Sequence, residues 1–125
     1  MADVVLDASA VLALLEDERG ADKVWAHLPG ARLSAVNAAE VVAKLVDGGS
    51  EPAEAGELLA RLGAEIVPFE AGDVALSAGA RRGGRALPLG ARACLALAER
   101  LGLPALTADR TWAELGGAAK VELIR

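Results

Sequence analysis

Val4-Val5-Leu6-Asp7, three aliphatic residues followed by an aspartate, predicts a short buried strand that ends in a carboxylate. A second apolar run near the other end, Leu103-Pro104-Ala105-Leu106, passes through Thr107-Ala108 into Asp109. Short continuous apolar runs predict parallel strands that are buried on both faces. The ends of such strands form the edge at which α/β domains bind ligands. We therefore expect the two aspartates to share one site.

Glu40 is the third candidate acid. It follows another short strand-like run, Ala31-Arg32-Leu33-Ser34, and we expect it in the first turn of a helix that Asn37 begins. Carboxylates gathered in one place repel one another unless a cation lies between them. Oxygen ligands of this kind suit Mg²⁺ or Mn²⁺. The sequence therefore predicts a metal-dependent acidic site.

Strand-like and helix-like segments alternate along the chain, which predicts an α/β domain with a parallel sheet and helices on both faces. The expected strands are residues 4–6, 32–34, 64–67, 105–106 and 121–124. The expected helices are residues 21–28, 37–47, 71–82, 89–101 and 110–115, with two more that Ser9 and Ser50 would cap. No repeat or linker divides the chain, so we predict a single domain spanning residues 1–125.

The composition bounds the class of protein. With 54% hydrophobic residues in 125, the chain is long and apolar enough to bury a core. We find no run long enough to cross a membrane, and the acidic start, with Asp3 and Asp7, does not resemble a secretion signal. A single cysteine, Cys94, fits a reducing compartment. We expect a soluble, cytoplasmic protein with no membrane partner.

Charge and aromatic content limit how the chain would touch nucleic acid. A net charge of −5 argues against a general nucleic-acid coat, which needs a basic face. Trp25, Trp112 and Phe69 are its only aromatic residues, too few for a platform that stacks bases. We expect any RNA to be held through phosphates, metal and shape.

Three segments in order resemble a PIN domain, and more narrowly the VapC toxins of bacterial toxin–antitoxin pairs. They are Val4-Val5-Leu6-Asp7-Ala8-Ser9-Ala10-Val11-Leu12-Ala13-Leu14-Leu15, Ser34-Ala35-Val36-Asn37-Ala38-Ala39-Glu40-Val41 and Leu106-Thr107-Ala108-Asp109-Arg110. The resemblance implies a three-layer α/β/α sandwich with a central parallel sheet of about five strands. It also implies a magnesium-dependent endoribonuclease with four acids, of which Asp7, Glu40 and Asp109 match the first, second and last.

The remaining family acid is missing from this chain. It would open the helix at residues 89–101, within Leu89-Gly90-Ala91-Arg92-Ala93, and here residue 91 is alanine. A carboxylate in that first turn would be stabilised by the helix dipole and would be a direct metal ligand. We expect this chain to be catalytically impaired. A deliberate Asp→Ala change, made because an active toxin poisons its host, is the interpretation we favour over a naturally degenerate member.

The resemblance also implies supporting roles. With the acid set intact, Asp7, residue 91 and Asp109 would hold Mg²⁺ (or Mn²⁺), and Glu40 would order or deprotonate a water. Three polar residues lie close in sequence to the acids, and we expect them to hydrogen-bond those acids; they are Ser9, Asn37 and Thr107. Arg92 would pair with an acid or with a substrate phosphate.

Each of these residues has a plainer interpretation. Asp7 and Asp109 could be helix N-caps, and Glu40 and Lys44 could form a surface pair four residues apart. The basic group Arg81, Arg82 and Arg85 could be a solvated helix end, and the alternative is contact with RNA phosphates. The aliphatic residues of two consecutive helices could be core, and the alternative is a groove for an antitoxin helix. They are Val41, Val42, Leu45, Val46, Leu58, Leu59 and Leu62.

The expected partners are a cognate VapB-type antitoxin, an RNA substrate and a second copy of the chain in a homodimer. Two other functions stay open. One is a catalytically dead binding module that keeps the fold and its partner. The other, more distant, is a phosphatase of the haloacid-dehalogenase type, which needs a second acid where this chain has Ser9.

Overall fold

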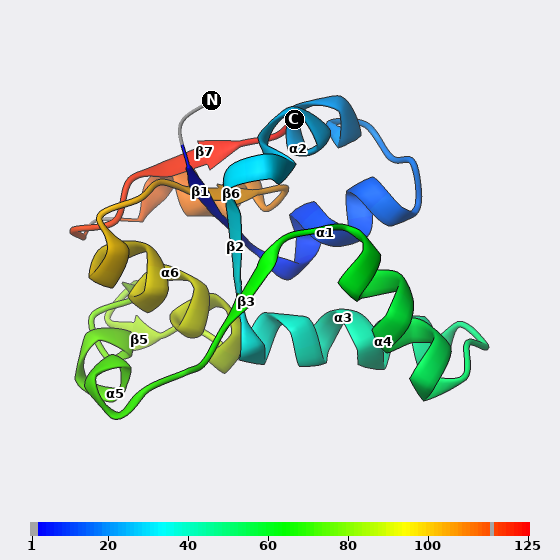
Figure 1. The fold of residues 1–125 in the computed structure, drawn as a ribbon. Helices are drawn as coiled ribbons and strands as arrows, with labels where there is room; N and C mark the ends of the chain where they lie inside the picture. The colour runs from blue at the N-terminus through cyan, green and yellow to red at the C-terminus, as the bar shows by residue number, and fades with distance from the viewer. Residues whose placement is uncertain (1–2, 116) are drawn as a thin grey trace.

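The computed structural model describes residues 3–115 and 117–125, so residues 1, 2 and 116 of the expected domain lie outside the described part. Strands and helices alternate as expected (Figure 1). In chain order they are β1 (Val4–Leu6), α1 (Ala8–Leu15), α2 (Ala21–His27), η1 (Leu28–Gly30), β2 (Ala31–Ser34), α3 (Ala35–Asp47), α4 (Pro52–Arg61), β3 (Glu65–Val67), α5 (Ala71–Ser77), β4 (Arg81–Arg82), β5 (Arg85–Ala86), α6 (Leu89–Leu101), β6 (Ala105–Thr107), η2 (Arg110–Glu114) and β7 (Val121–Leu123).

The main sheet has five strands in the order β3-β2-β1-β6-β7, and every neighbouring pair is parallel. This confirms the predicted α/β architecture with a central parallel sheet. β1 lies in the middle, with β2 on one side and β6 on the other. The direction in which successive strands are added reverses between β1 and β6, and such a switch point opens a crevice at the carboxyl ends of the strands.

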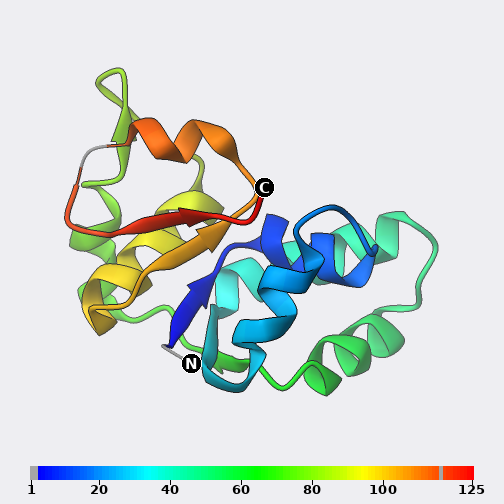
Figure 2. The same cartoon turned by 90° about the horizontal axis from the view of Figure 1, so that it is seen from above.

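Helices cover both faces of this sheet (Figure 2). Val4 and Leu6 point to one face, where they pack with apolar residues of α1, α2, α3 and α4. Val5 points to the other face and packs with α6, η2 and the buried Cys94. Burial on both sides is why these strands read as continuous apolar runs.

Two helix starts differ from the sequence expectation. α3 begins at Ala35, because the Ser34 hydroxyl accepts a hydrogen bond from the Val36 N–H at 3.2 Å and caps the helix. Asn37 therefore lies inside α3, and Glu40 is in its second turn. The expected cap Ser50 is also wrong, since Glu51 holds the N-cap position of α4.

The expected helix over residues 71–82 is too long. α5 ends at Ser77, and residues 81–86 form the antiparallel hairpin β4–β5. Gly83 and Gly84 have φ angles of 58° and 77°, which a two-residue hairpin turn requires and which glycine adopts without steric cost. The arginines at 81, 82 and 85 are therefore on an exposed hairpin, and the interpretation as a helix end is wrong.

The aliphatic residues of α3 and α4 serve mostly as core. Val41 and Leu59 are buried, and Val42, Leu45 and Leu62 pack against the same cluster. Two residues of the set, Val46 and Leu58, are not part of this cluster, and 41% of the surface of Leu58 is exposed. Over the described residues, no helix is long and apolar enough to cross a membrane.

A buried ion pair joins α5 to α6. Asp73 is 1% exposed, and its Oδ1 lies 2.8 Å from Nε of Arg100, while its Oδ2 accepts the Glu70 N–H at 2.9 Å. The carboxylate thus completes a capping box and neutralises a cation at once. Removal of Asp73 would leave Arg100 only its longer pair with Glu70, at 3.6 Å.

We predict that Asp73→Ala lowers the free energy of unfolding by about 3 kcal/mol, because it deletes the cap and leaves Arg100 without its close buried partner. Urea denaturation measures this change. Glu65→Ala is the matched control, because the 3.7 Å pair of Glu65 with Arg32 is solvent-exposed, and we expect a loss of less than about 1 kcal/mol. Equal losses for the two variants would contradict the assignment.

Candidate active site

The candidate site lies at the switch point between β1 and β6. Asp7 follows β1 directly, and its N–H donates to the carbonyl of Leu106 at 2.9 Å. Thr107 is the last residue of β6, and Asp109 follows two residues later. Pairing of the two strands thus brings residues that are 100 positions apart to one edge of the sheet.

Two hydroxyl groups hold the Asp7 carboxylate. Its Oδ2 accepts from Ser9 Oγ at 2.7 Å and from Thr107 Oγ1 at 2.9 Å. The Ser9 oxygen in turn accepts the Ala108 N–H at 3.0 Å, and the Thr107 oxygen accepts the Asp109 N–H at 3.0 Å. Main-chain groups therefore orient both hydroxyls toward Asp7. Ser9 does not cap α1 but belongs to this cluster, together with Thr107.

The environment of Asp7 opposes its ionisation. Asp7 is only 7% exposed, and burial raises the pKa of its carboxyl group above the usual range. Hydrogen bonds from Ser9, Thr107 and the backbone at Ala8 lower this pKa, and the nearby charge of Glu40 raises it again. A buried carboxylate beside a second acid is a costly arrangement that a bound cation would relieve.

Asn37 fixes the second acid. It is fully buried, and its Nδ2 donates to Glu40 Oε1 at 2.9 Å and to the carbonyl of Gly90 at 2.9 Å. The amide therefore ties the exposed Glu40 to the first turn of α6. Its own Oδ1 is buried and has no hydrogen-bond partner in the part of the chain that the structure describes.

The sequence places Gly90 within the segment at residues 89–93, but no role was expected for it. A Cβ atom at this position would collide with the carboxylate of Glu40, so the contact requires glycine. The sequence did offer a signal, namely a glycine in the first turn of a helix. Glycine is less favourable than alanine inside a helix, so its presence there calls for a reason. Close approach of another group explains its presence.

Asp109 lines the site and also caps a helix. Its Oδ1 accepts hydrogen bonds from Thr111, at 2.9 Å from the N–H and 2.7 Å from Oγ1, so it caps η2. Asp7, by contrast, occupies the N-cap position of α1 and makes no capping bond with its side chain. The N-cap interpretation thus holds for both residues in position, but only Asp109 caps its helix with its side chain.

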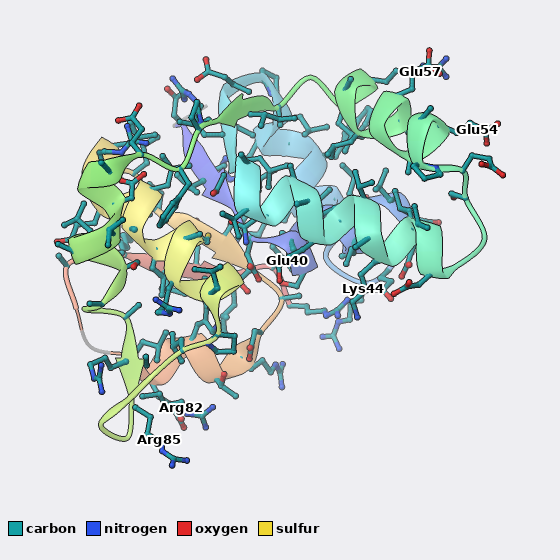
Figure 3. The ribbon with its side chains drawn as sticks, turned by 90° about the horizontal axis from the view of Figure 1, so that it is seen from below. Glu40, Lys44, Glu54, Glu57, Arg82 and Arg85 are labelled. Atoms are coloured by element: carbon teal, nitrogen blue, oxygen red, sulfur yellow. The ribbon has the colours of Figure 1, made fainter. Side chains whose placement is uncertain are left out.

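One open cleft of about 490 Å³ brings the candidate residues together. Its lining includes all three acids, residue 91 and the cations Lys44 and Arg82. Figure 3 shows Glu40 and Lys44 along α3, with Arg82 and Arg85 on the separate hairpin. Within the described residues, no ion pair joins Lys44 to Glu40, so the expected surface pair is not formed. Sequence reasoning did not place Lys44 in the site.

The oxygen atoms of the site are of the type that a hard divalent cation binds, but the set of carboxylates is incomplete. The oxygens of Asp7, Glu40 and Asp109 are the ligand type that Mg²⁺ and Mn²⁺ prefer. Among residues 3–115 and 117–125, however, no three acidic, histidine or cysteine side chains stand close enough to hold a metal ion. Ala91 lines the cleft where a fourth carboxylate would reach it.

The remaining predicted residues lie around the cleft or outside it. Arg92 Nε donates to the carbonyl of Leu87 at 2.8 Å, and Arg92 does not line the cleft. Arg81 donates to the carbonyl of Gly84 at 2.6 Å, and Arg82 pairs with Glu114 at 3.6 Å. Of the hairpin arginines only Arg82 reaches the cleft wall, and Arg85 stays on the exposed hairpin.

Comparison with known proteins gives one family. Residues 4–118 match the family model of the PIN domain. No curated protein sequence matches the chain.

Several solved structures share the fold. VapBC-5 from Mycobacterium tuberculosis is 25% identical, with a TM-score of 0.63 over 100% of this chain and 99% of that one. A toxin–antitoxin complex from Klebsiella pneumoniae is 17% identical, with a TM-score of 0.75 over 98% of both chains. VapBC2 from Rickettsia felis, bound to a promoter DNA fragment, is 14% identical, with a TM-score of 0.74 over 96% of this chain and 97% of that one.

We predict that Asp7→Asn raises the free energy of unfolding at neutral pH by about 1 kcal/mol. Because folding raises the pKa of Asp7, its contribution to stability is present at low pH and is lost as the pH rises through the raised pKa. Asparagine keeps an acceptor for Ser9 and Thr107 without the buried charge. Thermal unfolding across pH measures the difference, which should vanish in acid.

Asp109→Asn is the control for this experiment. Asp109 is exposed, and asparagine caps a helix about as well as aspartate does. We expect little change in stability at neutral pH. A loss of stability in Asp7→Asn at neutral pH would contradict the assignment of Asp7 as a strained buried charge.

We predict that Gly90→Ala displaces the Glu40 carboxylate and breaks its bond to Asn37, while the free energy of unfolding changes by less than about 1 kcal/mol. The clash falls on the far end of a flexible side chain, so the fold can absorb it. The side-chain amide signals of Asn37 in a ¹⁵N NMR spectrum should shift. Gly56→Ala, where the added Cβ meets no atom within 4 Å, should leave them in place.

Proposed function

Because the chain belongs to the PIN domain family, whose members are generally nucleases, we propose that it is a magnesium-dependent endoribonuclease toxin of a type II toxin–antitoxin pair. In the form with Ala91 the enzyme is inactivated. One observation carries the proposal: Asp7, Glu40, Asp109 and residue 91 line a single cleft at the switch point of the sheet. The catalytic assignment of the three acids rests on this convergence.

Asp7, Asp109 and a carboxylate at position 91 would hold the cation, Mg²⁺ or alternatively Mn²⁺. When bound, the ion would lower the pKa of a water and neutralise charge on the scissile phosphate. Ser9 and Thr107 occupy Oδ2 of Asp7, which leaves its Oδ1 available as a ligand. Their hydrogen bonds also keep the ligand in one rotamer, the usual role of groups behind a metal site.

Glu40 is suited to act on the attacking water. Asn37 holds its Oε1, and Gly90 gives its carboxylate room against α6. The other oxygen, Oε2, can then accept a proton from a water in the cleft. Asn37 is thus a positioning residue for Glu40.

Basic residues on the cleft wall support an anionic polymer as substrate. Lys44 and Arg82 come from separate elements and both line the cleft. With so few aromatic residues, contact with phosphates has to supply most of the affinity for RNA. Arg81 and Arg85 extend the same basic charge along the hairpin.

A VapB-type antitoxin is the proposed partner, because solved structures that share this fold come from toxin–antitoxin complexes. A homodimer is the proposed assembly. The second candidate function is a binding module that keeps the partner and lacks the chemistry, and Ala91 favours it for this form of the chain. A haloacid-dehalogenase-type phosphatase is disfavoured, because Ser9 takes the place of its second acid and hydrogen-bonds Asp7.

We predict that Ala91→Asp increases magnesium-dependent RNA cleavage by about 100-fold, because it restores a direct ligand to the cation. Denaturing gels of total RNA, with and without EDTA, measure the change. Ala91→Asn is the matched control, since it adds nearly the same volume without the charge and should stay inactive.

Equal cleavage by Ala91→Asp and the alanine form would overturn the proposed role of position 91. A binding module would show no magnesium response in either form. Turnover of a small phosphomonoester with no effect on RNA would favour the phosphatase instead.

A further inference from the structure

Beside the acidic cleft lies a second hollow of about 330 Å³, lined by Arg19, Ala108, Arg110 and Arg125. We call it the arginine hollow. Its three cations come from three separate segments: the loop after α1, the start of η2 and the residues after β7. Figures 1 and 2 both show the end of the chain beside the loop that follows α1.

The sheet and the main chain hold these segments together. β7 pairs with β6 in parallel, and the Ile124 N–H donates to the carbonyl of Thr107 at 2.9 Å, so both strands end at the same edge. Arg125 Nη1 donates to the carbonyl of Arg19 at 3.0 Å, and Arg110 Nε donates to a main-chain oxygen of Arg125 at 3.4 Å. The fold thus brings the three arginines together.

The charges in this hollow are poorly balanced. Glu18 pairs with Arg125 at 3.3 Å. In the described part of the chain, Arg19 and Arg110 form no ion pair with an aspartate or glutamate side chain. Three cations in one hollow repel one another. Such a basic cluster is also unexpected in a chain whose net charge is −5. Guanidinium groups bind phosphate oxygens through two parallel hydrogen bonds, so a phosphate is the ligand that best relieves this arrangement.

The position of the hollow indicates where its phosphate would come from, because the hollow lies next to the acidic cleft. Ala108 and Arg110 line the arginine hollow, and Asp109 between them lines the acidic cleft. The two sites therefore lie on either side of one turn of the chain. A polyanion bound in the cleft would reach the hollow across that turn.

We propose that the arginine hollow binds a backbone phosphate of the RNA beyond the scissile one, so that the strand crosses the turn at residues 108–110. This proposal rests on the proposed nuclease function. Arg19 and Arg110 carry the contact, and Arg125 is held in place by Glu18 and supports the wall. The hollow would determine how the strand lies in the cleft.

The test measures binding of a fluorescently labelled, single-stranded RNA to the chain with Ala91, because the proposed loss of cleavage in this form would leave the RNA intact during the measurement. Arg19→Gln and Arg110→Gln should each weaken binding by about tenfold, because each removes a charge-assisted contact to phosphate. Each should also reduce the slope of log K against log salt concentration by about 0.7. Arg61→Gln is the matched control, an exposed arginine at the end of α4 that lines neither site.

The two proposals fail in different ways. If the unmodified chain binds the RNA and both hollow variants bind it equally well with the same salt slope, the arginine hollow is not a phosphate site, and the nuclease proposal stands. If the unmodified chain does not bind RNA at all, both proposals fall. Weaker binding with an unchanged salt slope would assign a structural role and overturn the inference. Arg19→Gln removes no side-chain hydrogen bond of the described fold, so misfolding does not obscure its result.

Discussion

The site depends on the hydrogen bonds that Ser9 and Thr107 donate to the buried carboxylate of Asp7. These bonds join the ends of β1 and β6 and fix the acid on which the cleft is built. They also offset part of the cost of burying a charge, which is large when no partner is present. Because part of this cost remains, we expect a cation beside Asp7. The buried charge also lowers the stability of the fold at this site, as is common where residues are placed for function.

Much of this arrangement could be predicted from the sequence, because it follows from strand ends. Asp7 and Asp109 each follow a buried strand, and parallel strands end at the same edge. The five-stranded parallel sheet followed from the alternation of apolar runs with helical segments. Ser9 and Thr107 were expected beside the acids, and the structure places both on Asp7.

Other features depend on contacts that a periodic pattern does not encode. The α5 prediction ran too far, because the apolar spacing continues past Ser77 while Gly83-Gly84 signals a hairpin that only its turn residues reveal. The start of α3 was misplaced, since Ser34 and Asn37 are both good caps and only the structure shows which one is used. The contact of Gly90 with Glu40 joins two helices distant in sequence, and the arginine hollow joins three segments. Such meetings are set by tertiary packing.

The pairing of β1 with β6 also determines when the cleft can form during synthesis of the chain. Asp7 and Thr107 are 100 residues apart, so the acidic cleft cannot form until almost the whole chain has been made. Synthesis begins at the N-terminus, and contacts between distant residues form late because closing the intervening loop costs entropy. A growing chain therefore contains Asp7 long before Thr107 and Asp109 have been added. Any activity of the cleft therefore begins only after the ribosome has translated nearly all of the chain.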